Sequence, residues 1–297
     1  DVYKRQLECV GMSRKKPRPF PVPHDPIAGI SDAHTHLWSC GARDAEAVRQ
    51  FVRRAQDAGV EKLVTVGDDL AESEAVVEQA TWDPAVYAAC AIHPTKANEL
   101  DQNTRQRLRE LVAHPQCVAV GETGLDYYWL EHEPDTTASK EQQEEALRFH
   151  IDLAVESGKT LMIHNREGDT DLLRILADAP QPCYVQLHCF SSPLAVAEEA
   201  LSRGYILSFA GNVTFKRNEE LREAARIAPA GQILIETDAP YMTPEPFRGG
   251  KNEPSLIGHT FARVAEVRGE EPEELATHVS RTFDAIFGLS KKQHLPH

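Results

Sequence analysis

The segment SDAHTHL at residues 31–37 places two histidines, His34 and His36, one residue apart at the end of an apolar run. On a β-strand, residues two apart point to the same side, so both imidazoles would project together from one strand end. Such a pair is suited to binding a metal ion. It is equally consistent with two exposed loop histidines, so the interpretation depends on further ligands elsewhere in the chain.

Similar residues end other apolar runs of the chain. In a parallel barrel all strand carboxyl ends lie on one face, and that face carries the active site. Residues as far apart in sequence as His34 and Asp238 would therefore meet in one pocket. This pattern favours a metal site over chance, although each histidine alone is compatible with a structural role. The runs over 85–93, 117–122, 160–164, 183–188 and 232–238 end in His93, Glu122, His164, His188 and Asp238, respectively.

The chemistry of the candidates points to two metal ions. Four imidazoles and two carboxylates, without a cysteine, favour divalent ions such as Mg²⁺, Mn²⁺, Zn²⁺ or Co²⁺. A catalytic zinc usually takes three protein ligands, so six ligands are better used by two ions that share a carboxylate. Glu122 is central in the strand order and is the expected bridge. Asp238, on the strand next to the first in a closed barrel, is expected to bind metal and accept a proton from water. The predicted ligands are His34, His36, Glu122, His164, His188 and Asp238.

Residues that bind the substrate are predicted less directly. Arg166, two residues after a candidate ligand, could face the same pocket and pair with a phosphate oxygen, or form a surface ion pair. Tyr127 begins an aromatic cluster, and its ring could stack on a base or cap the barrel rim. Glu236 is expected to orient a ligand histidine or to pack inside the barrel. Cys189 should face away from the pocket by strand alternation.

The elements that would position these residues alternate along the chain. From residue 27 onward, short apolar runs are followed by polar turns and amphipathic stretches, several of which close on a glycine. Eight strands alternating with helices, without a linker in mid-chain, favour a single-domain α/β fold, the (β/α)8 TIM barrel. A doubly wound open sheet is the second possibility, weakened because no GxGxxG motif follows the first run. The predicted strands are 27–34, 61–67, 85–93, 117–122, 160–164, 183–188, 204–211 and 232–238.

Composition limits the range of functions. The 297 residues carry 32 Lys and Arg against 46 Asp and Glu, a net charge of −14, so no overall basic field attracts a polyanion. This argues against strong sequence-independent nucleic-acid binding, but not against an enzyme that holds a strand end through metal ions. The six cysteines show no CxxC spacing and indicate free thiols in a reducing compartment. Without a membrane-length apolar run or a recognisable signal peptide, we expect no membrane partner and a cytoplasmic location.

Both ends of the chain are expected to lie outside the barrel. DVYKRQ at residues 1–6 has no initiator Met and corresponds to translation of a common sequencing-library end. It is interpreted as an artefact, with the natural start near Met12. Residues 1–26 as a whole are expected to form a disordered lead-in, because the segment is basic and rich in proline. The barrel domain is assigned to 27–288 and a tail to 289–297.

The motifs together resemble those of the TatD-type metal-dependent deoxyribonuclease family, within the amidohydrolase-like barrels. They run in the expected order through nearly the whole folded region, and ETDAPY followed by RGGKNEP is the most specific combination. The matching segments are SDAHTHL at 31–37, AIHP at 91–94, GETGLDYYW at 121–129, MIHNRE at 162–167, LHCFSS at 187–192, GYILSFAGNVTFK at 204–216, ETDAPYMTP at 236–244 and FRGGKNEPSLI at 247–257.

The resemblance implies hydrolysis of phosphodiester bonds in DNA, often from the 3′ end of single strands, with Mg²⁺ or a similar ion. It implies that all six predicted ligands match the metal ligands of the family, and that His93 matches a residue that helps to bind phosphate. Three departures from the family pattern are mild: Ala91 stands for a common Gly, Thr160 for a common Pro, and Glu167 for a common Asp.

Three functions therefore stay open. The leading hypothesis is a monomeric two-metal nuclease whose substrate is DNA. The first rival is a hydrolase of an ester or amide on the same barrel, for example a D-aminoacyl-tRNA deacylase, because this fold hosts many chemistries. The second rival is a non-catalytic metal-binding protein, which loss of a ligand would favour, and none is lost. A basic rim around the site would favour DNA over a small neutral substrate, and the candidate rim residues are Tyr127, Arg166, Lys216, Arg217, Arg248 and Lys251.

Overall fold

Eight parallel strands, paired in sequence order from β1 to β8, form the centre of the molecule. The computed structural model describes residues 19–290. The predicted artefact at 1–6, most of the predicted lead-in and most of the predicted tail lie outside this range. The strands are β1 (Ile30–Thr35), β2 (Val60–Gly67), β3 (Val86–Cys90), β4 (Cys117–Asp126), β5 (Thr160–Arg166), β6 (Val185–Leu187), β7 (Ile206–Phe209) and β8 (Ile233–Ile235).

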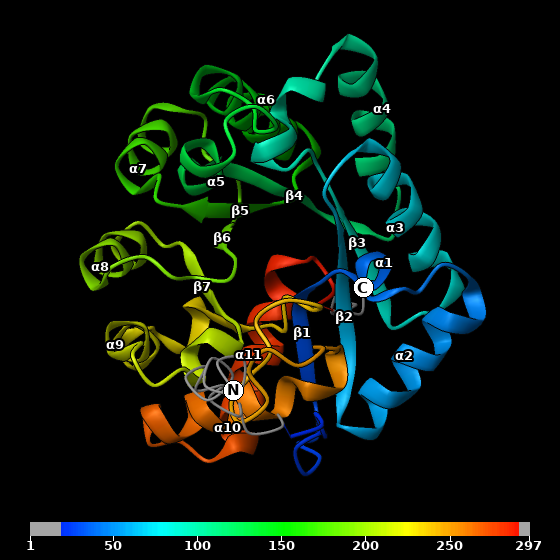
Figure 1. Cartoon of the computed structure of the whole chain (residues 1–297), viewed down its shortest axis with the longest axis vertical. Helices are drawn as coiled ribbons and strands as arrows, with labels where there is room; N and C mark the ends of the chain where they lie inside the picture. Colours follow the sequence, from blue (N-terminus) through cyan, green and yellow to red (C-terminus); the bar gives the residue numbers. More distant parts are fainter. Residues whose placement is uncertain (1–18, 291–297) are drawn as a thin grey trace, which may run out of the picture.

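Helices follow the strands and surround them, and the colours of Figure 1 pass once around the resulting ring. The amphipathic stretches between the apolar runs form helices, as predicted, among them α2, α6 and α8. The helices are α1 (Leu37–Cys40), α2 (Ala45–Asp57), α3 (Leu70–Trp82), α4 (Gln102–Val112), α5 (Tyr127–His132), α6 (Lys140–Ser157), α7 (Asp169–Asp178), α8 (Leu194–Ser202), α9 (Glu219–Ile227), α10 (Ile257–Arg268) and α11 (Pro272–Ile286).

Local chemistry explains where these helices begin and end. The Ser139 hydroxyl accepts from the backbone N–H of Gln142, whose side chain in turn accepts from the N–H of Ser139, so α6 starts with a reciprocal cap. The helix stops at Gly158, which adopts a left-handed φ of 66° that side chains with a Cβ disfavour. At the start of α2, the side chain of Asp44 accepts a hydrogen bond from the backbone N–H of Ala47, which is a simple cap without the reciprocal bond.

Backbone hydrogen bonds join the last strand to the first. The N–H of Asp238 donates to the carbonyl of His34 at 2.9 Å, and the N–H of His36 donates to the carbonyl of Ala239 at 2.7 Å. Below them, the buried carboxylate of Asp32 accepts from both the N–H and the hydroxyl of Thr237. These contacts bring the segments after β1 and β8 side by side. The predicted (β/α)8 barrel is confirmed, and the open-sheet possibility is excluded.

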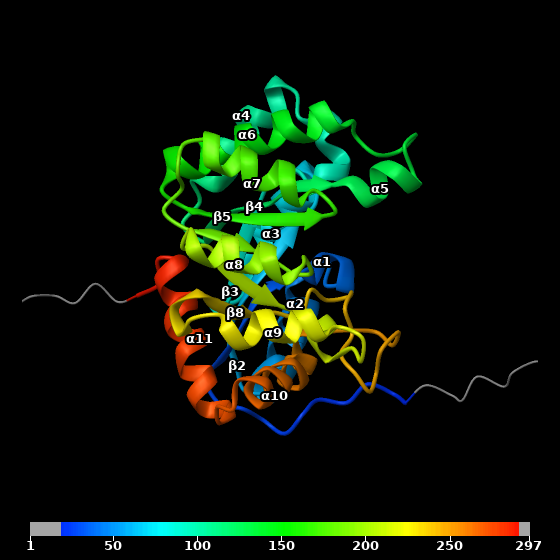
Figure 2. The ribbon, with the colours of Figure 1, turned by 90° about the vertical axis from the view of Figure 1, so that its left-hand side faces the viewer.

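The two ends of the barrel differ in what they carry. In Figure 2 the arrow of β5 points toward α5 and the loop around residues 241–250, whereas α11 lies at the opposite end. The strands themselves are almost entirely buried, as predicted for a parallel sheet covered by helices. No helix within residues 19–290 is both long and apolar enough to cross a membrane.

Residues 22 and 24, in the described part of the predicted lead-in, contact α10 of the barrel. Nε2 of His259, on α10, lies 2.9 Å from the carbonyl of Val22. The ring of His24 packs edge-on against the same imidazole, with centroids 5.3 Å apart. The Val22 carbonyl and the His24 ring thus join this segment to α10 through one side chain, His259.

Candidate metal centre

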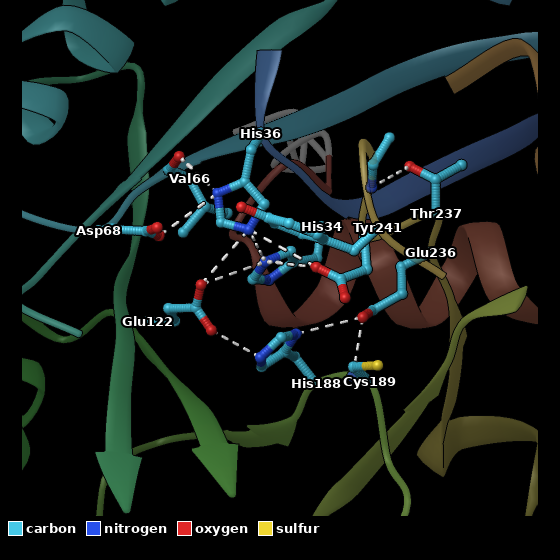
Figure 3. A network of polar contacts seen from close by, with 12 residues as sticks. His34, His36, Val66, Asp68, Glu122, His188, Cys189, Glu236, Thr237 and Tyr241 are labelled. Carbon is cyan, nitrogen blue, oxygen red and sulfur yellow. Dashed lines mark hydrogen bonds and ion pairs between the residues drawn. The ribbon is translucent and has the colours of Figure 1, made fainter. Parts of the chain in front are cut away.

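The predicted ligands meet in one cavity at the carboxyl end of the strands. The cavity has a volume of about 640 Å³, and residues at or after the carboxyl ends of all eight strands line it. Of the six predicted ligands, five line the cavity wall and the sixth, His34, lies buried directly beneath them (Figure 3). The convergence inferred from strand order is therefore realised in space, since the loops after parallel strands share one face.

His34 and His36 point together, as their spacing on a strand requires. Their Nε2 atoms lie 3.1 Å apart, and each also faces Oδ1 of Asp238, at 3.7 and 3.6 Å. The outer nitrogens are held by other groups: Nδ1 of His34 lies 3.1 Å from the sulfur of Met162, and Nδ1 of His36 lies 3.2 Å from the carbonyl of Val66. Both rings thus direct Nε2 to the same point.

His164 and His188 form the other half of the site. Nδ1 of His164 and Nε2 of His188 lie 3.3 Å apart, and they approach Oε2 of Glu122 to 3.3 and 2.7 Å. Each ring has a carboxylate on its far nitrogen: Asp126 lies 3.0 Å from Nε2 of His164, and Glu236 lies 3.2 Å from Nδ1 of His188. A carboxylate behind a histidine fixes the ring orientation and makes the inner nitrogen a better ligand.

Glu122 lies between the two histidine pairs. Its Oε1 is 3.7 Å from Nε2 of His34 and 3.4 Å from Nε2 of His36, while Oε2 faces the other pair. The sequence predicts Glu122 at the end of its strand, which is wrong: β4 continues to Asp126. The pairing of β4 with β5 shifts register between Val120 and Thr123, and this irregularity turns the Glu122 side chain into the cavity.

The charges of the cluster depend on one another. Burial opposes ionisation of Glu122, but the neighbouring His188 and His34 outweigh burial and hold the pKa of this carboxyl well below its usual range. Burial likewise opposes protonation of His36, yet Asp68 and Asp238 raise its pKa to about 10. His34 has no such excess of carboxylates, and burial with the nearby His188 lowers its pKa. Cations are therefore drawn into the centre, and protons and metal ions compete for the same nitrogens.

The arrangement fits divalent metal ions. Oε2 of Glu122 and Oδ1 of Asp68 are buried without a hydrogen bond of acceptable geometry, which is costly unless a cation satisfies them. Among residues 19–290, several sets of three ligand atoms lie within 4.8 Å of one another, and two of these consist of predicted ligands. Imidazole and carboxylate donors suit Zn²⁺, Mn²⁺, Co²⁺ or Mg²⁺. The two sets are His34, Glu122 and His188, and His34, His36 and Asp238.

Two carboxylates of the centre are missed by sequence reasoning. Oδ1 of Asp68 lies 3.5 Å from Nδ1 of His36, and burial raises the pKa of this carboxyl to about 7. Asp68 directly follows β2, so the strand-end rule could have found it, but the adjacent Asp69 reads as a helix cap. Asp126 similarly caps α5 by accepting from the N–H of Trp129, in addition to holding His164.

The residues predicted to bind substrate divide into two groups. His93 and Arg166 line the cavity. His93 packs against His164, with centroids 4.4 Å apart, and burial together with His164 lowers its pKa to about 3, so the ring is neutral. Tyr127 does not line the cavity: the chain turns into α5 there, and the hydroxyl donates to Asp171. Trp129, two residues on, is the aromatic side chain of this segment that reaches the cavity.

The expected orientation of Cys189 is wrong, since this residue lines the cavity beside His188. Strand β6 ends at Leu187, and Cys189 adopts a positive φ of 42°, so strand alternation no longer applies there. Its N–H donates to Oε1 of Glu236, the carboxylate that also holds His188 (Figure 3). Glu236 thus lies against the far nitrogen of His188, a predicted ligand, and is itself fully buried inside the barrel.

Comparison with known proteins gives consistent results. Residues 31–288 match the family model described as TatD related DNase. A metal-dependent hydrolase of Mycobacterium tuberculosis, itself uncharacterised, is 49% identical over 258 residues, which cover 87% of this chain and 97% of that protein. A 3′-5′ ssDNA/RNA exonuclease of Pantoea vagans is 32% identical, over 82% of this chain and 94% of its own length.

Solved structures agree on the fold. The crystal structure of YJJV, a TatD homologue from Escherichia coli, superposes with a TM-score of 0.80 at 26% identity, over 88% of this chain and 99% of that one. An N-acetyl-D-glucosamine-6-phosphate deacetylase from Mycobacterium smegmatis shares the barrel at only 12% identity, with a TM-score of 0.58. The second likeness is one of fold alone.

Proposed function

The chain belongs to the TatD-related DNase family of metal-dependent hydrolases, and from this premise we propose that it is an exonuclease that hydrolyses single-stranded DNA from the 3′ end. The observation that carries the proposal is the set of imidazole nitrogens that face Glu122 in a cavity also lined by Arg166 and Arg248. Metal ligands and cations in one cavity suit a phosphodiester better than a neutral ester. The Pantoea vagans relative, which is named a 3′-5′ ssDNA/RNA exonuclease, supports the polarity and the substrate.

Two divalent ions, with Mg²⁺ as the first choice and Mn²⁺, Zn²⁺ or Co²⁺ as others, are the proposed cofactors. His34, His36 and Asp238 would hold one, and His164 and His188 the other, with Glu122 shared between the pairs. When bound, such ions supply Lewis acidity at a phosphate oxygen and lower the pKa of a coordinated water. The carboxylates behind His164 and His188 keep the inner nitrogens aimed at this position.

The protein side chains have separate roles in the proposed reaction. A water oxygen bonds to phosphorus while the bond between phosphorus and the 3′ oxygen of the shortened strand breaks. Asp238 takes the proton of the water on its carboxylate, and the leaving 3′ oxygen takes up a proton from solvent. Arg166, at the end of β5, donates to a non-bridging oxygen of the phosphate that is attacked. The neutral His93 next to His164 offers a ring nitrogen on the same wall of the cavity, where it helps to position that phosphate.

The test is digestion of a 5′-labelled single-stranded oligonucleotide by metal-stripped protein, with Mg²⁺, Mn²⁺ or Co²⁺ added back. We expect a metal-dependent ladder that shortens from the 3′ end. Asp238→Ala should lower the rate on the order of 10³-fold or more, because a metal ligand and proton acceptor is lost. Asp152→Ala, an exposed aspartate on α6, is the matched control and should cut normally.

Two results would contradict the proposal. A folded, metal-loaded protein that cleaves no oligonucleotide with any of the three ions would overturn the nuclease activity and favour ester or amide hydrolysis at the same site. Retained cleavage in Asp238→Ala would overturn the role given to that carboxylate. Circular dichroism of each variant establishes that lost activity does not reflect unfolding.

A further inference from the structure

More than half of the basic side chains within residues 19–290 form ion pairs with carboxylates. Arg54 pairs with Glu253 at 2.8 Å, and Lys96 beside the cavity pairs with Asp69 at 2.7 Å. Ion pairs of this kind occur on most outer helices, although several other Lys and Arg side chains within residues 19–290, Arg148 among them, form none. A cation without such a pair is informative where it also lines the cavity, because its charge then stays available to a ligand there even though the chain has a net charge of −14.

Two arginines that line the cavity belong to this unpaired class. Neither Arg166 nor Arg248 forms an ion pair with another residue in the range 19–290. Each lies over an aromatic ring instead: the guanidinium of Arg166 is 3.6 Å from the ring centroid of Tyr128, and that of Arg248 is 4.1 Å from that of Phe215. Stacking on a ring holds the guanidinium plane in place while its charge and N–H donors stay available.

The two arginines lie on different parts of the cavity wall. Arg166 ends β5 and packs against the segment that follows β4, whereas Arg248 lies in the loop after β8 and packs against the segment that follows β7. Helix α5, which follows β4, and the loop after β8 are at the same end of the barrel in Figure 2. Because Arg166 is carried by β5 and Arg248 by a separate loop, and each stacks on a ring of its own, the two guanidinium groups are suited to two different phosphates.

The mouth of the cavity also exposes apolar side chains. Trp129, Tyr241 and Met242 are more exposed than is usual for large apolar residues, and all three line the cavity. The Tyr241 ring packs edge-on against His36 at 5.9 Å, so it extends from the metal centre outward. Flat apolar groups beside free guanidinium groups match a ligand that alternates bases with phosphates, since aromatic rings stack on any base.

We propose that the site binds two consecutive phosphates of one strand: Arg166 the phosphate that is hydrolysed, and Arg248 the phosphate next to it. The proposal rests on the nuclease function above and narrows its substrate. The preferred substrate is then an oligonucleotide of at least three nucleotides, which carries two phosphodiesters, and a diester with a single phosphate is hydrolysed less efficiently. An uncharged ester offers nothing to Arg248.

The test removes the arginine and the neighbouring phosphate charge separately and together. The substrates are a thymidine trinucleotide and the same trinucleotide with an uncharged methylphosphonate at the linkage that is not hydrolysed. For the wild-type protein we expect kcat/KM to fall about 10-fold when that phosphate charge is removed. This fall corresponds to the weaker end of the range for hydrogen bonds to charged groups, because Arg248 is exposed to solvent. In Arg248→Gln the same chemical change should alter kcat/KM by less than about 3-fold, as expected when a pair has lost one partner.

The controls separate this inference from the function on which it rests. Arg148→Gln removes an exposed arginine on α6 that has no ion pair or ring contact within residues 19–290, and it should retain the wild-type sensitivity to methylphosphonate. Equal loss in the wild-type protein and in Arg248→Gln would overturn the role of Arg248 while leaving the nuclease activity in place. Failure of the wild-type protein to cut either trinucleotide or longer strands would overturn the proposed function itself.

Discussion

Buried histidines occur in two regions of this molecule with opposite surroundings. His150, on α6, is fully buried, and both ring nitrogens have protein partners: Nε2 accepts from the N–H of Ile92 at 3.2 Å, and Nδ1 lies 2.7 Å from the carbonyl of Ala146. In the metal centre the inner nitrogens of His34, His36, His164 and His188 face one another and carboxylates instead.

The comparison shows that burial alone does not identify a ligand. An imidazole that accepts a hydrogen bond on one nitrogen and donates one from the other has both nitrogens paired in its neutral form. Such a ring needs neither a second proton nor a metal ion. A ring whose inner nitrogen faces other nitrogens and buried carboxylates lacks a cation, because several lone pairs converge there without a donor for each. What distinguishes the two regions is the partner of each nitrogen.

The largest expected effect separates the two kinds of histidine. His164→Ala should lower hydrolysis of single-stranded DNA on the order of 10³-fold, since several kcal/mol of metal-dependent stabilisation are lost, and it should lower the number of metal ions bound per folded chain. His150→Ala should keep its metal content and change kcat/KM little, while the free energy of unfolding falls by roughly 2 kcal/mol because the N–H of Ile92 loses its acceptor.

Metal content by elemental analysis, activity and urea unfolding are measured on both variants. The side chain of His164 is about 20% exposed, so its loss leaves a folded barrel. An equal loss of metal from both variants would remove the distinction between the two regions.

The second effect concerns pH. Burial lowers the pKa of His150 to about 4 from its usual 6.5, so the unfolded chain takes up a proton between these values that the folded chain refuses. The contribution of His150 to stability is therefore complete above pH 6.5 and is lost as pH falls through this window, by about 3 kcal/mol in total at roughly 1.4 kcal/mol per pKa unit.

Urea unfolding of metal-stripped protein at a series of pH values measures this effect. Other groups also titrate here, so the quantity to compare is the slope of unfolding free energy against pH in the wild-type protein and in His150→Gln. The variant should show the shallower slope between pH 6.5 and 4. Identical slopes would mean that His150 takes up its proton equally well in the folded state.

Strand order and strand parity together predict most of the fold and much of the site. The alternation of apolar runs and amphipathic stretches is enough for the barrel, and the carboxyl-end rule then brings His34 and Asp238 into one cavity. The rule fails where the backbone departs from regular strand geometry. Glu122 enters the cavity through a register shift within β4, and Cys189 through a positive φ after β6.

Contacts between residues far apart in the sequence are the second feature of the site that the sequence does not predict. Asp68 and Asp126 each adjoin a helix start, where an aspartate has a sufficient local explanation as a cap or a polar turn residue. Only the folded chain shows that Asp68 faces His36 and that Asp126 holds His164. The unpaired state of Arg248 is equally invisible in sequence, because it depends on which carboxylates lie nearby in space.

The smallest expected effect tests whether a helix cap can also serve the metal centre. Asp126 and Asp44 both accept a backbone N–H at the start of a helix, but only Asp126 also lies against His164, a predicted ligand. Asp126→Asn keeps an amide oxygen for the cap and removes the negative charge behind His164. We expect 10- to 100-fold weaker metal binding or activity, the usual result of removing a carboxylate that orients a metal-bound histidine.

Asp44→Asn is the matched control, because asparagine and aspartate cap helices about equally well. It should leave both metal affinity and turnover unchanged. Titration of Mn²⁺ into metal-stripped protein, with activity measured at each concentration, shows whether Asp126→Asn shifts the metal requirement or only the rate at saturation. A shift in the metal requirement is expected if the carboxylate acts through the histidine. Wild-type behaviour of Asp126→Asn in both measurements would make Asp126 a cap alone, and would place it with His150 among groups that the fold itself satisfies.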